Sequence, residues 1–201
     1  PALAARDVSK LADLAGETGA VTVAADASTM DGISAIFEAV DAIGDKLAVA
    51  VYNPSYRVRG SIAEVDPAEV QKALQITAYG AFLVGQQAAR RMLASGGGTI
   101  LFTGASAGVK GYPLSAAFAM GKFALRGLAQ SMARELHPKG IHVAHVVIDG
   151  MIRNPGRTEP ADKPDSMLDP NAIAETYVQL AEQDRSIWTW EIETRPWVEN
   201  F

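Results

Sequence analysis

Cysteine is absent from the 201-residue sequence, which excludes a disulfide framework, a thiol nucleophile and a cysteine-based metal site. No apolar run approaches the roughly 20 residues that a bilayer-spanning helix needs, and the first residues lack a signal-peptide pattern. Positive charge is also scarce, because 18 Lys and Arg face 23 Asp and Glu and leave a net charge of -5. We therefore expect no nucleic-acid partner, no membrane partner and a cytoplasmic location.

Hydrophobic residues supply 48% of the chain, enough for one well-packed domain or part of one. Buried-strand patterns alternate with helical patterns and short connections. This alternation predicts a single Rossmann-like domain over residues 1–201, a doubly wound parallel sheet in a three-layer α/β/α arrangement. The strands are expected at residues 20–25, 47–52, 99–103 and 141–148, and the helices at 8–15, 33–40, 66–94, 115–137 and 170–183.

Single residues predict where two of these helices begin or end. Gly16 is expected to end the first helix, and Asp66 to cap a helix that has Pro67 at its first position. Residues 154–169 hold three prolines, several charges and little apolar content, so we expect a mobile loop or lid there. Residues 186–192 are strand-like and would close the domain.

Residues 99–140 carry the most specific pattern. A short apolar run leads into Gly104-Ala105-Ser106-Ala107-Gly108, where small side chains let the backbone approach a ligand closely. A long amphipathic helix follows and ends at His137-Pro138-Lys139-Gly140. Its apolar face consists of Phe118, Leu125, Leu128, Met132 and Leu136.

This stretch resembles the active-site segment of the short-chain dehydrogenase/reductase family, in which a serine precedes the tyrosine of Y-x-x-x-K by thirteen residues. Lys122 stands at the lysine position, which places Phe118 at the tyrosine position and Ala105 at the serine position. The asparagine of the family's catalytic tetrad falls on Thr77. The resemblance implies an NAD(P)-dependent oxidoreductase acting on a small molecule, with a degenerate tetrad. A divergent subset of the family has Phe in place of Tyr, and this chain looks like that subset.

The resemblance also implies where a cofactor would bind. Asp26, with Ala27 beside it, matches the aspartate that meets the adenine ring, and Arg6 stands where other members bind the 2′-phosphate of NADP. Because Ala5 replaces an acidic residue common in NAD-preferring members, NADP is favoured over NAD. The remaining matches in the cofactor pocket are Asn53, Gly150 and Lys122.

One part of the family pattern has no counterpart. No G-x-x-x-G-x-G loop, which cradles the cofactor pyrophosphate, precedes Arg6. In the family's strand order, 3-2-1-4-5-6-7, the strand before that loop is central. We expect either that the chain lacks an upstream strand, loop and helix, or that another segment fills the slot.

Several of these residues have a simpler interpretation. Lys122 could be a solvated helix lysine rather than a ligand of the nicotinamide ribose, and Asp26 and Arg6 could be a turn residue and a surface charge. Ser106 could contact a substrate carbonyl after a small loop shift, or its hydroxyl could bond the backbone. Tyr112 and Ser115 are nearby hydroxyls with weaker claims.

The aromatic and histidine residues suggest structural roles. His142 and His145 differ by an odd number of positions, so they lie on opposite faces of a strand and no metal site is expected. Trp188, Trp190 and Trp197 could line a substrate pocket, but packing of a closing strand or an oligomer contact is the simpler role.

The resemblance implies an assembly as well as an activity. In the family, the counterparts of helices 66–94 and 115–137 pair across a two-fold axis, so we expect a homodimer or homotetramer. The contact surface would include Ala73, Ile76, Ala81, Leu125 and Met132. The alternative function is a catalytically inactive nucleotide-binding or scaffold protein that keeps the same fold.

Overall fold

The strands of the computed structural model, which describes residues 1–199, form parallel sheets. Four strands build the largest sheet in the order β3-β4-β5-β8, and β1-β2 and β6-β7 form two separate pairs. The strands are β1 (Ala2–Ala5), β2 (Val21–Ala24), β3 (Val49–Tyr52), β4 (Gly98–Thr103), β5 (Ile141–Ile148), β6 (Met151–Ile152), β7 (Met167–Leu168) and β8 (Glu191–Thr194). The four predicted strands and the parallel Rossmann-like α/β fold are confirmed.

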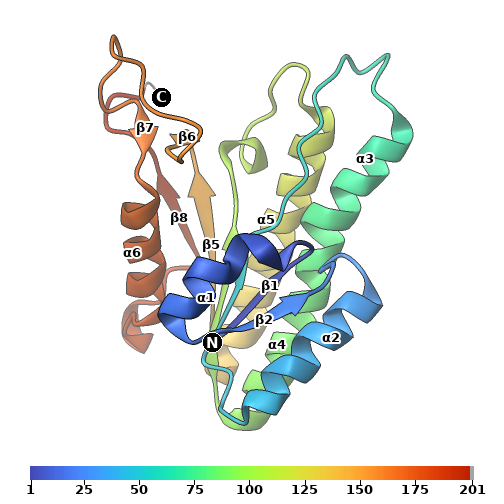
Figure 1. The fold of residues 1–201 in the computed structure, drawn as a ribbon, viewed down its shortest axis with the longest axis vertical. Coiled ribbons are helices and arrows are strands. Elements are labelled where there is room, and N and C mark those ends of the chain that lie inside the picture. Colours follow the sequence, from blue (N-terminus) through green and yellow to red (C-terminus); the bar gives the residue numbers. More distant parts are fainter. Residues whose placement is uncertain (200–201) are drawn as a thin grey trace.

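The helices flank the main sheet. In Figure 1, α4 and α5 cover one face and α6 lies on the other side of β5 and β8. Asp66 and Pro67 open α3 as predicted, whereas Gly16 lies inside α1, which ends instead at Gly19 in the left-handed conformation. The helices are α1 (Ala12–Thr18), α2 (Met30–Ile43), α3 (Pro67–Leu74), α4 (Gly80–Ser95), α5 (Ala116–Leu136) and α6 (Pro170–Ala181). Within residues 1–199, none is both long and apolar enough to cross a bilayer.

The predicted continuous helix over 66–94 contains a π-helical turn, Gln75–Tyr79, between α3 and α4. The phenol of Tyr52, at the end of β3, donates a hydrogen bond to the carbonyl oxygen of Ile76 inside this turn. Gly80 follows it and packs so closely on the Tyr52 hydroxyl that a β-carbon there would collide with it. The contacts of Tyr52 therefore fix the end of β3 and the π-helical turn relative to one another.

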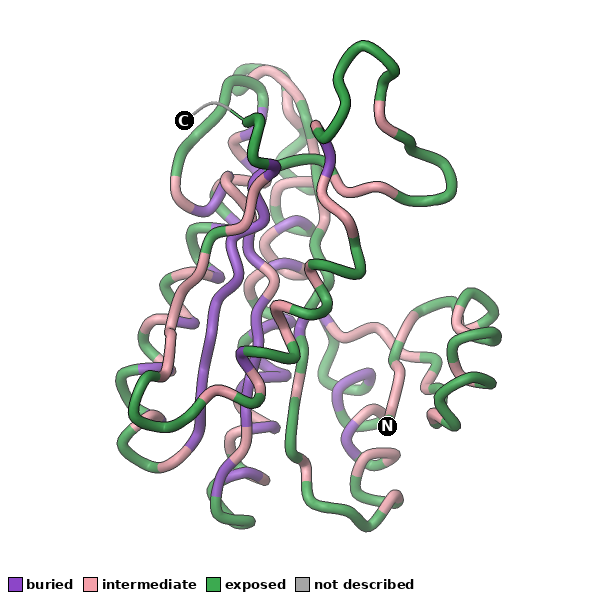
Figure 2. Tube along the Cα trace, turned by 90° about the vertical axis from the view of Figure 1, so that its left-hand side faces the viewer, coloured by how far each residue is buried: buried purple, intermediate pink, exposed green. Residues whose placement is uncertain are grey.

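The core lies along the two central strands. Every residue of β5 is buried, and Figure 2 shows buried residues concentrated on the central strands and the helix turns beside them. The larger cluster packs β4 and β5 against α4 and α5, and a smaller one packs the opposite face against Leu180 of α6. Ala73, Ala81 and Leu125 are 0% exposed. They belong to this interior, so placing them on an outer contact surface was wrong.

The N-terminal part of the chain is covered far less. No residue before Ser28 is buried. The strands at 20–25 and 47–52 were expected to be buried, but Val21, Val49 and Val51 are 47%, 42% and 50% exposed. The reason is that α4 covers only the Ala50 and Tyr52 side of β3, and no described element covers the side of Val49 and Val51.

This asymmetry predicts unequal costs for two register partners. Leu101 of β4 lies opposite Val51 of β3, and the two side chains are 1% and 50% exposed. Leu101→Ala should lower the free energy of unfolding by about 2–5 kcal/mol because it leaves a cavity. Val51→Ala should cost no more than about 1 kcal/mol. Urea unfolding of both variants measures the difference, and equal losses would mean that the outer face of β3 is covered in solution.

Candidate functional site

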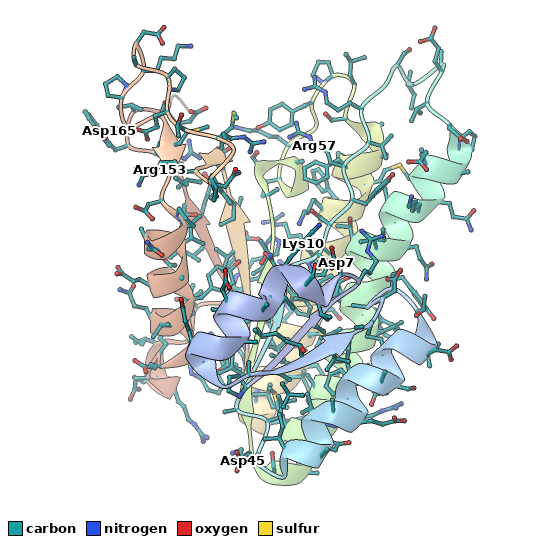
Figure 3. The ribbon with its side chains drawn as sticks, in the orientation of Figure 1. Asp7, Lys10, Asp45, Arg57, Arg153 and Asp165 are labelled. Carbon is teal, nitrogen blue, oxygen red and sulfur yellow. The ribbon has the colours of Figure 1, made fainter. Side chains whose placement is uncertain are left out.

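A cavity of about 1230 Å³ opens at the carboxyl ends of β3, β4 and β5. Its walls come from the segment after β3, the turn after β4, the start of α5 and the loop between β6 and β7. In Figure 3, Arg57 lies at the upper opening on the segment after β3, with the loop that carries Asp165 across from it. Sheets of this class place ligand sites at the carboxyl ends of their strands, which makes this cavity the candidate ligand site. We call it the cleft.

Lys122 lies at the base of the cleft. Its side chain comes from α5, is 2% exposed, and its ammonium donates a 2.6 Å hydrogen bond to the carbonyl oxygen of Thr103 at the end of β4. Burial lowers the pKa of Lys122 to about 8. The interpretation as a solvated helix lysine is therefore wrong.

Phe118 and Ala105 line the same cleft without offering a hydroxyl. Two cations lie near the Phe118 ring: the guanidinium carbon of Arg57 is 5.5 Å from its centroid and the Lys122 nitrogen is 5.9 Å from it. Both contacts lie in the range of cation–π attraction. Phe118 thus helps to place a guanidinium in the cleft.

The candidate hydroxyls lie near this pair. Ser106, Tyr112 and Ser115 all line the cleft. Within residues 1–199, the Ser106 hydroxyl makes no hydrogen bond, so its expected alternative role of bonding the backbone is not seen. The Tyr112 ring is 42% exposed, with the ammonium of Lys110 5.7 Å from its centroid, and Ser115 is buried at the start of α5.

The predicted cofactor residues fall into two cavities. Asn53, Gly150 and Lys122 line the cleft, whereas Arg6, Asp26 and Ala27 border a second cavity of about 310 Å³ at the ends of β1, β2 and β3. Ser55 borders both, so the two cavities adjoin.

Two acidic residues, Asp7 and Asp26, and two basic ones, Arg6 and Lys10, border the second cavity. Asp7 and Lys10 pair with each other at 3.8 Å. The Asp26 carboxylate accepts hydrogen bonds from the Ser28 hydroxyl (2.6 Å) and backbone N–H (2.9 Å), which lower the pKa of Asp26. Asp26 is thus a turn residue that also faces the cavity. The Arg6 guanidinium has no hydrogen bond or ion pair within residues 1–199, and its charge also helps to lower that pKa.

Thr77 lies outside the cleft. It is buried in the π-helical turn, where its hydroxyl accepts a 3.2 Å hydrogen bond from the backbone N–H of Tyr56. Gly121 of α5 packs against it, so closely that a β-carbon there would lie 3.0 Å from the Thr77 β-carbon. Thr77 therefore positions α5 and the segment after β3.

The histidines are structural. His145 is fully buried, and its Nδ1 lies 3.0 Å from the Glu191 carboxylate, which also binds the guanidinium of Arg126. Burial lowers the pKa of His145 despite the nearby carboxylate. His142 stacks on Trp188 with 5.0 Å between ring centroids. None of the tryptophans lines the cleft, and within residues 1–199 no three His, Asp or Glu side chains form a possible metal site.

The sequence analysis missed four basic residues of the cleft, Arg57, Arg59, Arg157 and Lys163. A signal was available for two of them, because Arg57-Val58-Arg59 follows the strand at 47–52 after a short turn, at the end of the sheet where ligands bind. Arg157 and Lys163 come from the loop at 154–169, and no pattern in the sequence brings that loop back over the cleft.

Comparison with known proteins covers nearly all of the chain. Residues 2–189 match a family model described as enoyl-(acyl carrier protein) reductase. A short-chain dehydrogenase from Rhodopseudomonas palustris is 39% identical, with a TM-score of 0.82 over 98% of this chain and 86% of that one. A metagenomic short-chain oxidoreductase solved in complex with NADP is 27% identical, with a TM-score of 0.83 over 98% and 86% of the two chains.

Curated relatives agree but are longer. The L-2,3-butanediol dehydrogenase of Corynebacterium glutamicum is 30% identical over 150 residues, 74% of this chain and 57% of that protein. The chain spans about half the length of such relatives. The match over residues 2–189 and the shared fold nevertheless show that the chain belongs to the short-chain dehydrogenase/reductase family.

Proposed function

We propose that this chain is an NAD(P)-dependent oxidoreductase domain over residues 1–201, acting on a small molecule with altered acid–base groups. The observation that carries the proposal is the joint placement of Lys122, Asn53 and Gly150 on one cleft at the carboxyl ends of the strands. The family relationship supplies the reaction class, since relatives of this fold are named as dehydrogenases.

The two adjoining cavities fit the two ends of a dinucleotide. Small alanine side chains and the open guanidinium of Arg6 border the smaller one, which suits an adenosine with a 2′-phosphate. Lys122 and Asn53 would hold the nicotinamide ribose in the cleft. When bound, NADP(H) supplies or accepts the hydride.

Proton transfer would fall to unusual groups. Phe118 and Ala105 replace the family's tyrosine and serine, so the chain lacks the hydroxyls that deliver a proton to the substrate oxygen. Lys122, with its pKa near 8, is largely an ammonium at neutral pH and could donate a proton; as an amine above pH 8 it could accept one. Carbonyl reduction would therefore be favoured below pH 8 and alcohol oxidation above it. Ser106 is the second candidate, because its hydroxyl is not engaged elsewhere.

The alternative function is a catalytically inactive nucleotide-binding or scaffold protein. Phe118 and Ala105 favour this alternative, because without a phenol and a serine at these positions the family's usual proton relay is missing. If the chain is an active enzyme, we propose that it belongs to the divergent subset of the family that has Phe in place of Tyr. Cofactor titration followed by a reductase screen over carbonyl compounds separates the two functions.

Assembly as a homodimer or homotetramer is part of the proposal. The outer surfaces of α4, α5 and the π-helical turn expose large apolar side chains, which soluble monomers rarely gather in one place. They are Tyr79, Phe82, Leu93, Met120 and Phe123, each 41% to 50% exposed.

Cofactor choice gives the first test. Calorimetry should show tighter binding of NADP than of NAD, because Arg6 is open to the 2′-phosphate and Ala5 brings no opposing charge. Arg6→Ala should weaken NADP binding about tenfold and leave NAD binding unchanged. Lys46→Ala, an exposed cation outside both cavities, serves as the control. Equal binding of the two cofactors would contradict the assignment of Arg6.

Sedimentation tests the assembly. The wild-type chain should sediment as a dimer or tetramer at micromolar concentration, and Phe123→Glu should shift it toward the monomer because it buries a charge in the contact. Glu135→Gln on the same helix, at an exposed position paired with Lys139, should leave the assembly intact. A wild-type monomer would rule the assembly out.

Catalysis gives the strongest test. Wild-type protein should oxidise NADPH slowly with ordinary ketones, whereas Ala105→Ser with Phe118→Tyr should raise the rate, by up to about 10²–10⁴-fold if the full acid–base contribution returns. Lys122 is already placed at the base of the cleft to lower the pKa of the new phenol. Robust wild-type turnover that persists in Ser106→Ala and Tyr112→Phe variants would contradict the prediction of slow turnover, and would mean that Lys122 or another group carries the proton.

A further inference from the structure

Basic residues gather on the cleft although the whole chain is acidic. The net charge is -5, yet within residues 1–199 the cleft is lined by five basic side chains and two acidic ones. The basic residues are Arg57, Arg59, Lys122, Arg157 and Lys163, and the acidic ones are Asp149 and Glu199. Asp149 already pairs with Lys110 at 3.7 Å and Arg195 at 3.3 Å, so among residues 1–199 Glu199 is the remaining carboxylate to set against the five basic side chains.

The four outer cations have no anionic partner in the part of the chain that the structure describes. Within residues 1–199, the side chains of Arg57, Arg59, Arg157 and Lys163 form no hydrogen bond or ion pair. Some arginines elsewhere are paired, since Arg91 binds Asp41 at 2.6 Å and Arg126 binds Glu191 at 2.6 Å. Like charges gathered without counter-charges repel one another, and an anion that enters between them relieves that repulsion.

The loop between β6 and β7 holds its cations toward the cleft by its own contacts. The backbones of Arg157 and Asn154 pair at 2.9 Å and 3.0 Å in a tight turn. The carboxylate of Glu159 is occupied by the backbone N–H groups of Asp165 and Met167, at 3.3 Å and 3.2 Å. This nearby acid therefore braces the loop and does not pair with Arg157 or Lys163.

Arg57 marks which end of the cleft is charged. Its guanidinium lies over Phe118, the residue at the family's tyrosine position, where the reacting group of a substrate is expected. Figure 3 shows Arg57 across the opening from the loop between β6 and β7, so cations reach the space from two sides. The residues expected to bind adenosine border the other cavity. The 2′-phosphate of NADP would therefore lie there and not among the cations of the cleft.

We infer that the cleft binds a substrate with a carboxylate or phosphate group, held by Arg57 on one side and Arg157 on the other. A guanidinium presents two parallel N–H donors that match either oxyanion. The inference rests on the proposed function in calling the bound molecule a substrate. Binding of an oxyanion to these arginines does not depend on turnover.

Matched pairs of small molecules test it. Lactate with lactamide, and glycerol 3-phosphate with glycerol, are titrated by calorimetry into the protein with and without saturating NADP. At least one anion should bind about tenfold or more tightly than its uncharged partner. That preference should shrink when ionic strength rises from about 0.01 M to about 0.15 M, because the screening length falls from about 30 Å to about 8 Å.

Three variants sharpen the test. Arg57→Gln and Arg157→Gln should each weaken binding of that anion about tenfold and leave the uncharged partner unaffected. Arg134→Gln, at an exposed arginine near the far end of α5, should change neither. Equal affinity for charged and uncharged partners, including no measurable binding of either, would overturn the inference.

The outcomes separate this inference from the proposed function. Loss of anion binding when NADP is present would assign the cluster to the cofactor's phosphates and overturn the inference. Arginine-dependent anion binding without any NADP binding would support the oxyanion site and count against the dehydrogenase. Turnover of neutral carbonyl compounds by a protein that binds neither anion more tightly than its uncharged partner would support the dehydrogenase and defeat the oxyanion site.

Discussion

The hydrogen bond from the buried Lys122 ammonium to the Thr103 carbonyl oxygen joins the cleft to the core. A buried ammonium without a partner would cost several kcal/mol, so this bond fixes how far α5 can slide along β4. Phe118, Lys122, Leu125 and Ala129 follow one another on a single helix face, from the cleft to the fully buried interior. Any shift of α5 would therefore disturb the candidate site and the hydrophobic core together.

Close packing transmits this constraint to the far wall of the cleft. Gly121 lets α5 approach Thr77, and Thr77 accepts the N–H of Tyr56, the residue directly before Arg57. On the other side of α5, a β-carbon at Gly108 would lie 3.0 Å from the carbonyl oxygen of Lys122. The guanidinium of Arg57 then comes to lie over Phe118. Thr77 thus acts as a spacer that places an arginine.

Local patterns were enough to predict the parallel sheet and the start of α3, because periodicity and helix caps are contained in short stretches. Local patterns did not predict how exposed the side chains of each strand are. The apolar runs at 20–25 and 47–52 look buried in isolation, but burial depends on which distant helix covers each face, and Val51 is half-exposed for that reason. The π-helical turn was missed as well, because it depends on a phenol 24 positions earlier in the chain. The basic cleft was missed because its members come from segments about 100 residues apart.

The charge of the cleft shows why composition constrains large partners better than small ligands. A net charge of -5 opposes binding to an extended polyanion, which averages the potential over much of the surface. A small oxyanion meets only the groups within about one screening length, roughly 8 Å at physiological ionic strength. Inside the cleft those groups are predominantly arginines and lysines, since Asp149 is neutralised by Lys110 and Arg195. An acidic chain can therefore present a strongly cationic site, provided that its carboxylates are paired elsewhere, as those of Asp41, Glu191 and Asp169 are.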